Sequence, residues 1–304
     1  MAKIPLVPIV TVVIVAASGL AAFLNYSSRL GSGTGGETRK NLPFSSSKTE
    51  KLAELITECD GYLRSQEWAK AVEVMNKAID IDASDTLLVK RGEIFIDWQK
   101  QERAIPDFSL ALKLNAQNDK ALLNRAACYY ATRSYQLAMA DYQTILALKK
   151  STYSKEAILG QALCHYSLGQ YGLAIHQCRE LLNSSPKYLK AIEVLANCQL
   201  RQGSYLDAVD TYTSGLRIDH DAAGLYFGRS SAYFKNNMPE RALADLQKAT
   251  QCSPSNIEYH LKCATVAKSL GKNDLVRSEA ESVLKLSKDN KEAEALLHAL
   301  SVVN

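Results

Sequence analysis

The chain reads ALLNRAACYYATRSYQLAMADYQTIL from Ala121 to Leu146, and this stretch decides the fold. Its apolar and small residues fall into two sets. Leu122, Ala126 and Tyr129 form the first set, and Ala138 and Tyr142 belong to the second. Steps of three and four residues place each set on one face of a helix, so the stretch predicts two consecutive amphipathic helices.

The alanine at position 138 belongs to a series that runs through most of the chain. Its members are Ala71, Ala104, Ala138, Ala174, Ala208, Ala242 and, in the seventh place, Val276. The intervals between them are 33, 34, 36, 34, 34 and 34 residues. A fixed period of this size indicates supersecondary units that cannot bury their apolar faces alone and therefore stack on their neighbours.

Each unit also carries an earlier helical pattern, in which a large residue is followed four positions later by a small one. The pair is Leu122 and Ala126 in the third unit, and Tyr226 and Ser230 in the sixth. Turn signals such as Leu168-Gly169-Gln170-Tyr171 separate the two patterns. The unit is therefore predicted to be a helix–turn–helix hairpin, whose small residue lets the second helix come close.

This layout closely resembles the tetratricopeptide repeat, with repeats 3 and 6 as the best matches; His260 and Val276 depart from it in repeat 7. The resemblance implies an all-α fold, a right-handed superhelical solenoid of about seven helix–turn–helix repeats over residues 49–289. The repeats are expected near 52–84, 85–118, 119–152, 155–188, 189–222, 223–256 and 257–289. Residues 290–304 form an amphipathic stretch that predicts a helix capping the open end of the stack.

The first part of the chain has a different composition. Residues 4–24 contain no charged side chain and are rich in Val, Ile, Leu and Ala. At about 1.5 Å per residue this length crosses a bilayer core, so residues 1–24 are predicted to be an N-terminal transmembrane anchor. Residues 25–48 are rich in Ser, Gly and Thr and are predicted to be a flexible linker.

A cleaved signal peptide is the alternative for the same segment, with a small-residue cleavage site near Ala22. The apolar run is longer than a usual signal core, which favours the anchor. The seven cysteines form an odd set with no close pairing pattern, which suits a reducing compartment. These observations predict a single-pass membrane protein with its repeats in the cytosol.

The composition excludes several function classes. The net charge of +4 and the scattered basic residues do not indicate a nucleic-acid partner. No paired carboxylates or Ser–His–Asp set stands out, so we expect no enzyme activity, no cofactor and no small-molecule substrate. Cys164, His165, His176 and Cys178 are four possible zinc ligands in repeat 4. His165 and Cys178 are expected at inward packing positions, whereas Cys164 and His176 are expected on other faces of their helices. No metal site is predicted.

In tetratricopeptide proteins the first helix of each repeat lines a concave groove, so the resemblance places the candidate site there. The predicted peptide-binding residues are Leu123, Asn124, Tyr130, Leu159, Tyr166, Asn197, Arg201, Phe227 and Phe234. Tyr130, Tyr166, Leu200 and Phe234 share one repeat position and either form an apolar ladder along the groove or pack against the next repeat.

A known subfamily binds the C-terminal carboxylate of chaperones through a clamp of Lys, Asn and Arg. Asn124 matches the middle repeat of that clamp, but Val89 and Glu93 stand where the first Lys and Asn would be, so this clamp is not expected. The sequence predicts a membrane-tethered scaffold or adaptor that binds a partner protein in its groove. The alternatives are a secreted or lumenal binding protein and a self-assembling structural solenoid.

Overall fold

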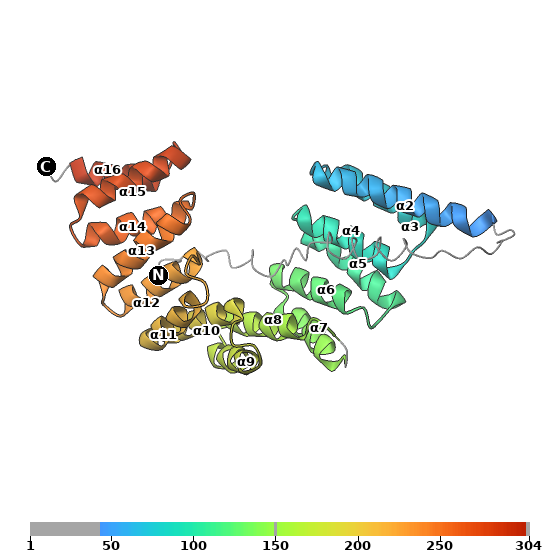
Figure 1. The fold of residues 1–304 in the computed structure, drawn as a ribbon, viewed down its shortest axis with the longest axis horizontal. Coiled ribbons are helices and arrows are strands. Elements are labelled where there is room, and N and C mark those ends of the chain that lie inside the picture. The colour runs from blue at the N-terminus through green and yellow to red at the C-terminus, as the bar shows by residue number, and fades with distance from the viewer. Residues whose placement is uncertain (1–42, 149–150, 302–304) are drawn as a thin grey trace, which may run out of the picture. The chain divides into compact units, whose positions relative to one another are not determined.

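The computed structural model describes residues 43–148 and 151–301. In this part of the chain fifteen α-helices follow one another without an intervening strand (Figure 1). The helices are α2 (Pro43–Arg64), α3 (Trp68–Ile81), α4 (Asp85–Asp97), α5 (Gln101–Leu114), α6 (Asp119–Ala131), α7 (Tyr135–Ala147), α8 (Ser154–Ser167), α9 (Tyr171–Ser184), α10 (Leu189–Gln202), α11 (Tyr205–Leu216), α12 (Ala223–Lys235), α13 (Pro239–Cys252), α14 (Ile257–Ser269), α15 (Asn273–Leu286) and α16 (Lys291–Ser301). The predicted all-α fold of consecutive helices is confirmed.

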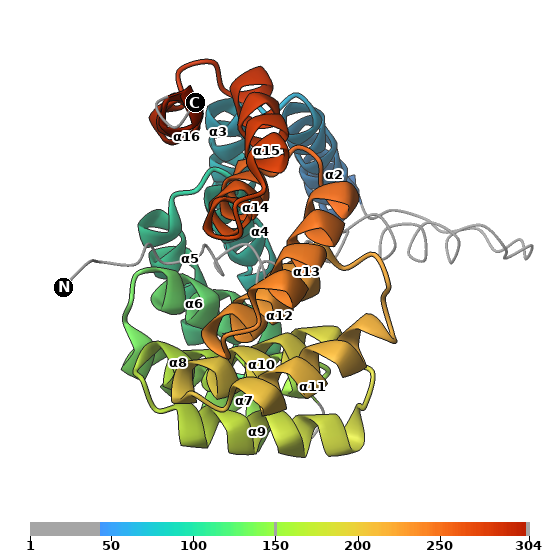
Figure 2. The same cartoon turned by 90° about the vertical axis from the view of Figure 1, so that its left-hand side faces the viewer.

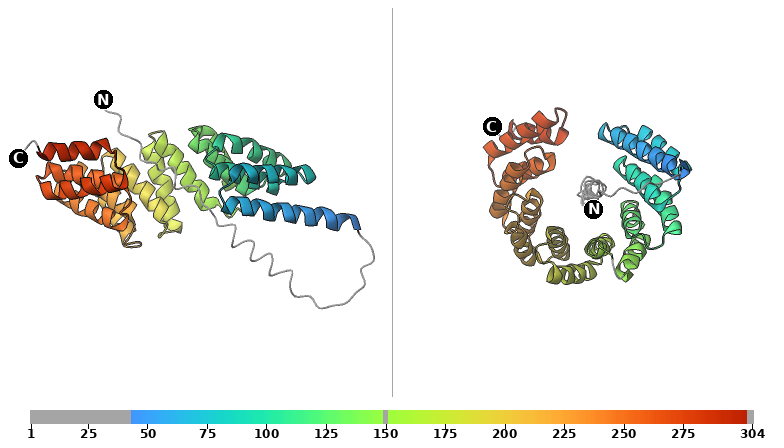
Figure 3. Two further views of the ribbon diagram at one scale, coloured as in Figure 1. Left: turned by 90° about the horizontal axis from the view of Figure 1, so that it is seen from above. Right: turned by 45° about the vertical axis from the view of Figure 1, so that its right-hand side comes forward.

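The chain forms two compact units, and the boundary between them lies within α8, after Cys164. In the N-terminal unit the hairpins α2–α3, α4–α5 and α6–α7 pack in chain order. In the C-terminal unit the helices α10 to α16 also pack on one another in chain order. Figure 2 shows this succession from α12 to α15. Figure 3 shows the same helices side by side from orange to red. We call the even-numbered helices α2 to α14 the A helices and their odd-numbered partners the B helices.

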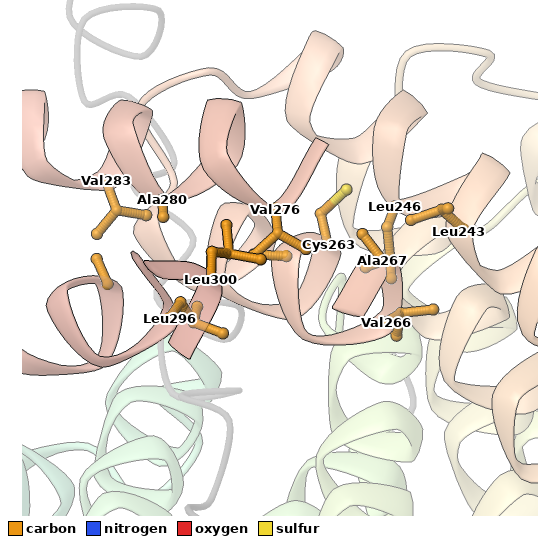
Figure 4. Packing of buried hydrophobic residues seen from close by; sticks show 12 residues of the cluster. Leu243, Leu246, Cys263, Val266, Ala267, Val276, Ala280, Val283, Leu296 and Leu300 are labelled. Carbon is orange, nitrogen blue, oxygen red and sulfur yellow. The ribbon is translucent and has the colours of Figure 1, made fainter. Parts of the chain in front are cut away.

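The alanine series forms the contact between the paired helices. All six alanines and Val276 have no exposed surface. Near the chain end, Val276, Ala280 and Val283 of α15 pack with Leu296 and Leu300 of α16 (Figure 4). Asn290 accepts a hydrogen bond from the Ala293 amide through Oδ1 at 3.0 Å and so begins α16. The helix expected within residues 290–304 therefore covers the last hairpin.

Each turn from an A helix to a B helix contains one residue with a left-handed backbone. These residues are Gln66, Gln99, Arg133, Gly169, Gly203, Asn237 and Gly271. They have the same spacing as the alanine series, and each lies five positions before its member. Four repeats therefore place a non-glycine residue in a conformation that favours glycine.

We expect Gly203→Ala to lower the free energy of unfolding of the C-terminal unit by about 1 to 2 kcal/mol, the cost of placing a Cβ in the left-handed region. A Cβ at Gly203 would have no heavy atom within 4 Å, so crowding does not contribute. Gly172→Ala, inside α9 with its nearest neighbour at 3.9 Å, is the matched control and should stabilise the helix. Urea unfolding followed by circular dichroism measures both; equal midpoints would contradict the expectation.

The N-terminal part departs from the sequence prediction in one respect. Helix α2 begins at Pro43, inside the segment 25–48 that was predicted to be a linker. Proline suits the first position of a helix because its missing amide hydrogen is not needed there. The anchor predicted for residues 4–24 lies outside the described residues. Within 43–148 and 151–301, none of the helices combines the length and apolarity that a bilayer crossing needs.

Candidate functional site

In the N-terminal unit, two of the predicted binding residues are part of the core. Leu123 is 9% exposed and Leu159 is 4% exposed, so both support the A helices by packing. Tyr130 lies against Tyr135 at the start of α7, with ring centroids 5.5 Å apart. The structure therefore places this aromatic ring against the B helix of its own repeat, a contact that was not expected from the sequence.

Asn124 of α6 takes part in a polar network on the neighbouring A helices. Its amide nitrogen donates to Glu93 Oε1 of α4 at 3.0 Å. The Lys120 ammonium also lies 2.7 Å from Glu93 Oε1. The carboxylate on α4 is thus held by two groups from the next A helix, so Asn124 has a partner within the protein.

In the C-terminal unit, Tyr166 and Arg201 lie around the same aromatic side chain. The rings of Tyr166 and Tyr171 are 5.6 Å apart in an edge-on arrangement. The Arg201 guanidinium lies 5.9 Å from the centroid of the Tyr171 ring. A hydrogen bond with Tyr171 raises the pKa of Arg201, and the arginine itself remains exposed. These three residues form an aromatic and cationic cluster near the ends of α8 and α10.

The side chain of Asn197 is held in position by a tyrosine of the B helix α11. The hydroxyl of Tyr212 donates to Asn197 Oδ1 at 2.7 Å, and the tyrosine is fully buried. Burial raises the pKa of Tyr212 above its usual range, so this hydroxyl keeps its proton. The bond orients the side chain of Asn197, whose amide nitrogen is a hydrogen-bond donor.

Phe227 and Phe234 of α12 both meet side chains of α14. The Phe227 ring stacks on Tyr259 with centroids 4.8 Å apart and planes 30° apart. Phe234 is 40% exposed, and the Lys262 ammonium lies 5.7 Å from the centroid of its ring. The A helices α12 and α14 therefore present the stacked rings of Phe227 and Tyr259, and α12 also carries the exposed ring of Phe234.

A third set of side chains adjoins this aromatic pair. A Cβ placed at Gly224 of α12 would lie 4.0 Å from Glu193 Oε1 of α10 and 3.9 Å from the Tyr259 hydroxyl oxygen of α14. Gly224 is exposed, whereas Glu193 and Tyr259 are partly buried. Burial raises the pKa of Glu193, against the lowering influence of Lys190. Glu193, Gly224 and Tyr259 are called the Glu193 notch below.

Three buried ion pairs that join A and B helices were not predicted from the sequence. In each, an arginine of the A helix makes two hydrogen bonds to an aspartate sixteen residues later, and Nη1 reaches the preceding B helix. The triads are Arg91–Asp107 with Asn76, Arg125–Asp141 with Ser109, and Arg229–Asp245 with Thr213. The recurring separation of sixteen residues was the signal that could have found them.

The arrangement of possible metal ligands differs from the expectation in detail. Cys164 is fully buried, while His165 Nδ1 lies 2.6 Å from Gln170 Oε1 in the turn after α8. Cys164 therefore faces the core and His165 the turn, the reverse of the predicted orientation. In the described residues no group of three His, Cys, Asp or Glu side chains is placed to hold a metal ion. Burial raises the pKa of Cys164 and Cys178 to about 12, which is typical of structural thiols.

Comparison with known proteins identifies the repeat. The family model described as "Tetratricopeptide repeat" matches residues 99–152 and 193–257. A model described as "Anaphase-promoting complex, cyclosome, subunit 3" matches residues 144–214. Among solved structures, a tetratricopeptide repeat protein from Parabacteroides merdae has a TM-score of 0.66 at 20% identity, over 83% of this chain and 99% of that one. The Cut9–Hcn1 hetero-tetramer of the APC/C has a TM-score of 0.60 at 17% identity, over 80% and 48%.

The curated relatives are more distant in sequence and longer. DnaJ homolog subfamily C member 3 of Gallus gallus is 24% identical over 69% of this chain and 38% of its own length. The DnaJ homolog subfamily C member 7 homolog of Schizosaccharomyces pombe is 22% identical over 67% and 40%. RNA polymerase II-associated protein 3 of Xenopus laevis is 27% identical over 60% and 30%. The matched region spans between 30% and 40% of the length of these three relatives.

Proposed function

The chain carries tetratricopeptide repeats, a fold compatible with binding other proteins, and from this premise we propose that it is a non-catalytic scaffold or adaptor. In this proposal the A helices α10, α12 and α14 of the C-terminal unit bind a segment of a partner protein. We further propose that residues 4–24 hold the repeats at a membrane. Their uninterrupted apolar composition supports this second part, and resistance of the full-length chain to alkaline carbonate extraction tests it.

The observation that carries the binding proposal is Phe234. This large apolar side chain is 40% exposed, although its repeat offers many buried positions. The Lys262 ammonium lies 5.7 Å from the centroid of its ring, and two turns earlier on α12 the Phe227 ring stacks on Tyr259. Exposed aromatic rings with polar neighbours are typical anchors of protein interfaces, because they bury much area at a low cost in side-chain entropy.

Asn197 supports the same proposal from the neighbouring A helix. Its orientation is set by the bond from Tyr212 and so does not depend on the partner. A side chain that is held before binding loses little entropy when it donates to a peptide carbonyl. The surface thus combines an apolar anchor with a preorganised polar donor, which suits an extended segment more than a globular face.

We expect the double variant Tyr166→Ala, Phe234→Ala to weaken peptide binding at least about tenfold, because it removes two aromatic anchors. The probe is a displayed library of random twelve-residue peptides, selected on the full-length chain and followed by affinity measurement on the selected peptides. The matched control is Leu173→Ala, Leu206→Ala, which removes two leucines of the B helices α9 and α11 that are 54% and 57% exposed.

Circular dichroism must show the same helix content in both double variants. If the Tyr166→Ala change unfolds the protein, the single variant Phe234→Ala replaces the aromatic double variant in the test. If the control variant weakens binding as much as the aromatic variant, the binding surface is not on the A helices. If the wild-type chain selects no peptide above background, the proposed function is wrong.

A further inference from the structure

The N-terminal unit shows how a carboxylate on the face of an A helix is neutralised. Glu93 of α4 receives the ammonium group of Lys120 at 2.7 Å and the amide of Asn124 at 3.0 Å. Both groups come from the next A helix, α6. In this pair of repeats the carboxylate is therefore matched by a lysine that the following repeat supplies. Glu93 lies eleven residues before Ala104, and Glu193 of α10 lies fifteen residues before Ala208, one helical turn earlier in its repeat.

The C-terminal unit has a glycine at the repeat position of that lysine. Lys120 lies eighteen residues before Ala138, and Gly224 lies eighteen residues before Ala242. The backbone of Gly224 adjoins a carboxylate of the preceding A helix, since its Cβ position is 4.0 Å from Glu193 Oε1. Because glycine has no side chain, this repeat leaves open the space from which a lysine would reach Glu193.

The carboxylate of Glu193 is not otherwise satisfied. Within the described residues it has no salt bridge and no hydrogen bond, and Lys190, one turn earlier on the same helix, is the charged group that influences it. Burial outweighs that influence and raises the pKa of Glu193. A partly buried carboxylate without a bonded partner gains more from an incoming cation than an exposed one, because the local dielectric constant is lower.

The other wall of the notch also favours a cation. The hydroxyl oxygen of Tyr259 lies 3.9 Å from the Cβ position of Gly224 and can accept a hydrogen bond. The Tyr259 ring stacks on Phe227, which continues the wall as an apolar surface for a methylene chain. A long side chain with an ammonium group at its end matches this combination of apolar wall, phenol oxygen and carboxylate.

We propose that the Glu193 notch binds the ammonium group of a lysine side chain from the partner segment. This inference rests on the proposed function and names the chemistry of one partner residue. The Glu193 carboxylate accepts hydrogen bonds from the ammonium, Tyr259 accepts another, and the lysine stem lies along the Phe227 and Tyr259 rings. The site selects lysine over an uncharged side chain of the same length.

The test uses the same displayed library of random twelve-residue peptides, selected in parallel on the full-length wild-type chain and on Glu193→Gln. We expect peptides from the wild-type selection to carry lysine at one fixed position. Replacing that lysine with norleucine should weaken binding to the wild type at least about tenfold, the loss expected for a hydrogen bond to a charged group. The same replacement should change binding to Glu193→Gln less than about twofold.

A second variant tests the inference without removing the carboxylate. Gly224→Lys supplies the ammonium from the chain itself, as Lys120 does, and should abolish the preference for lysine in the peptide. Gly172→Lys, which adds the same charge on the exposed side of α9, is the matched control and should leave the preference intact. Circular dichroism checks that each variant keeps its helix content.

The outcomes separate the inference from the proposed function. If the wild type selects peptides that lack a fixed lysine, or if Glu193→Gln keeps the lysine preference, the inference is wrong and the peptide-binding scaffold stands. If the selected peptides instead carry a fixed arginine, and replacing that arginine with norleucine weakens binding, the choice of lysine is also wrong. If the wild type selects no peptides, the proposed function fails and the inference fails with it.

Discussion

Replacing Asp141 with alanine is expected to lower the free energy of unfolding of the N-terminal unit by about 3 to 5 kcal/mol, the usual cost of removing one partner from a buried ion pair. The Asp141 side chain is 8% exposed and Arg125 is 21% exposed. Arg125 donates from Nε and Nη2 to the two carboxylate oxygens at 2.8 and 2.7 Å. The variant would leave this guanidinium desolvated with Ser109 as its remaining bonded side chain.

The double variant Arg125→Met, Asp141→Leu separates two causes of that loss: the missing ion pair and the buried charge left without a partner. It removes the pair and leaves no buried charge, so we expect it to be more stable than Asp141→Ala alone. Glu73→Ala, which removes an exposed pair with Lys77 on α3, is the control and should change little, because solvent screens such pairs. Urea unfolding measures the stability of all three variants, provided that the dependence of the free energy of unfolding on urea concentration has the same slope in each. If Asp141→Ala lowers the free energy of unfolding as little as Glu73→Ala does, the expectation is wrong and the Arg125 guanidinium is hydrated in the variant.

Gly228→Ala is expected to lower the free energy of unfolding of the C-terminal unit by about 1 to 3 kcal/mol, because it overfills a packed contact. A Cβ at this position would lie 2.5 Å from two ring carbons of Tyr212 and 2.6 Å from its hydroxyl oxygen. Tyr212 is fully buried, so its ring has no open space into which to move. The shift would also disturb the hydrogen bond from Tyr212 to Asn197, and peptide binding should weaken together with stability.

Gly224→Ala on the same helix is the matched control for stability. Its Cβ would be 3.9 to 4.0 Å from its nearest neighbours, which is ordinary contact, so we expect it to stabilise α12 by up to about 1 kcal/mol. The double variant Gly228→Ala, Tyr212→Leu removes the ring that causes the clash. If crowding is the cause, it should be more stable than the sum of the single changes predicts. If the effects of the two single changes on the free energy of unfolding simply add, the loss in Gly228→Ala arises from the backbone of α12 and not from crowding with Tyr212.

The period of the sequence determined the fold class without reference to any contact. One alanine in each of six units, with steps of three and four residues around it, is sufficient because helix pairing depends on local spacing and on a small residue where two helices meet. The same period locates the turns, since their left-handed residues follow it. It also named the A-helix positions from which Asn197, Phe227 and Phe234 come.

Only the tertiary structure decided which of the predicted site side chains are buried and which are exposed. The sequence could not tell Leu123 and Leu159, which are buried, from Phe234, which is exposed, because they share an apolar character and a helix type. Exposure depends on the neighbouring repeat, which supplies Lys120 next to Glu93 in one unit and Gly224 next to Glu193 in the other. The periodic pattern is a property of one helix, whereas the proposed site lies where successive A helices meet, and their side chains differ from repeat to repeat.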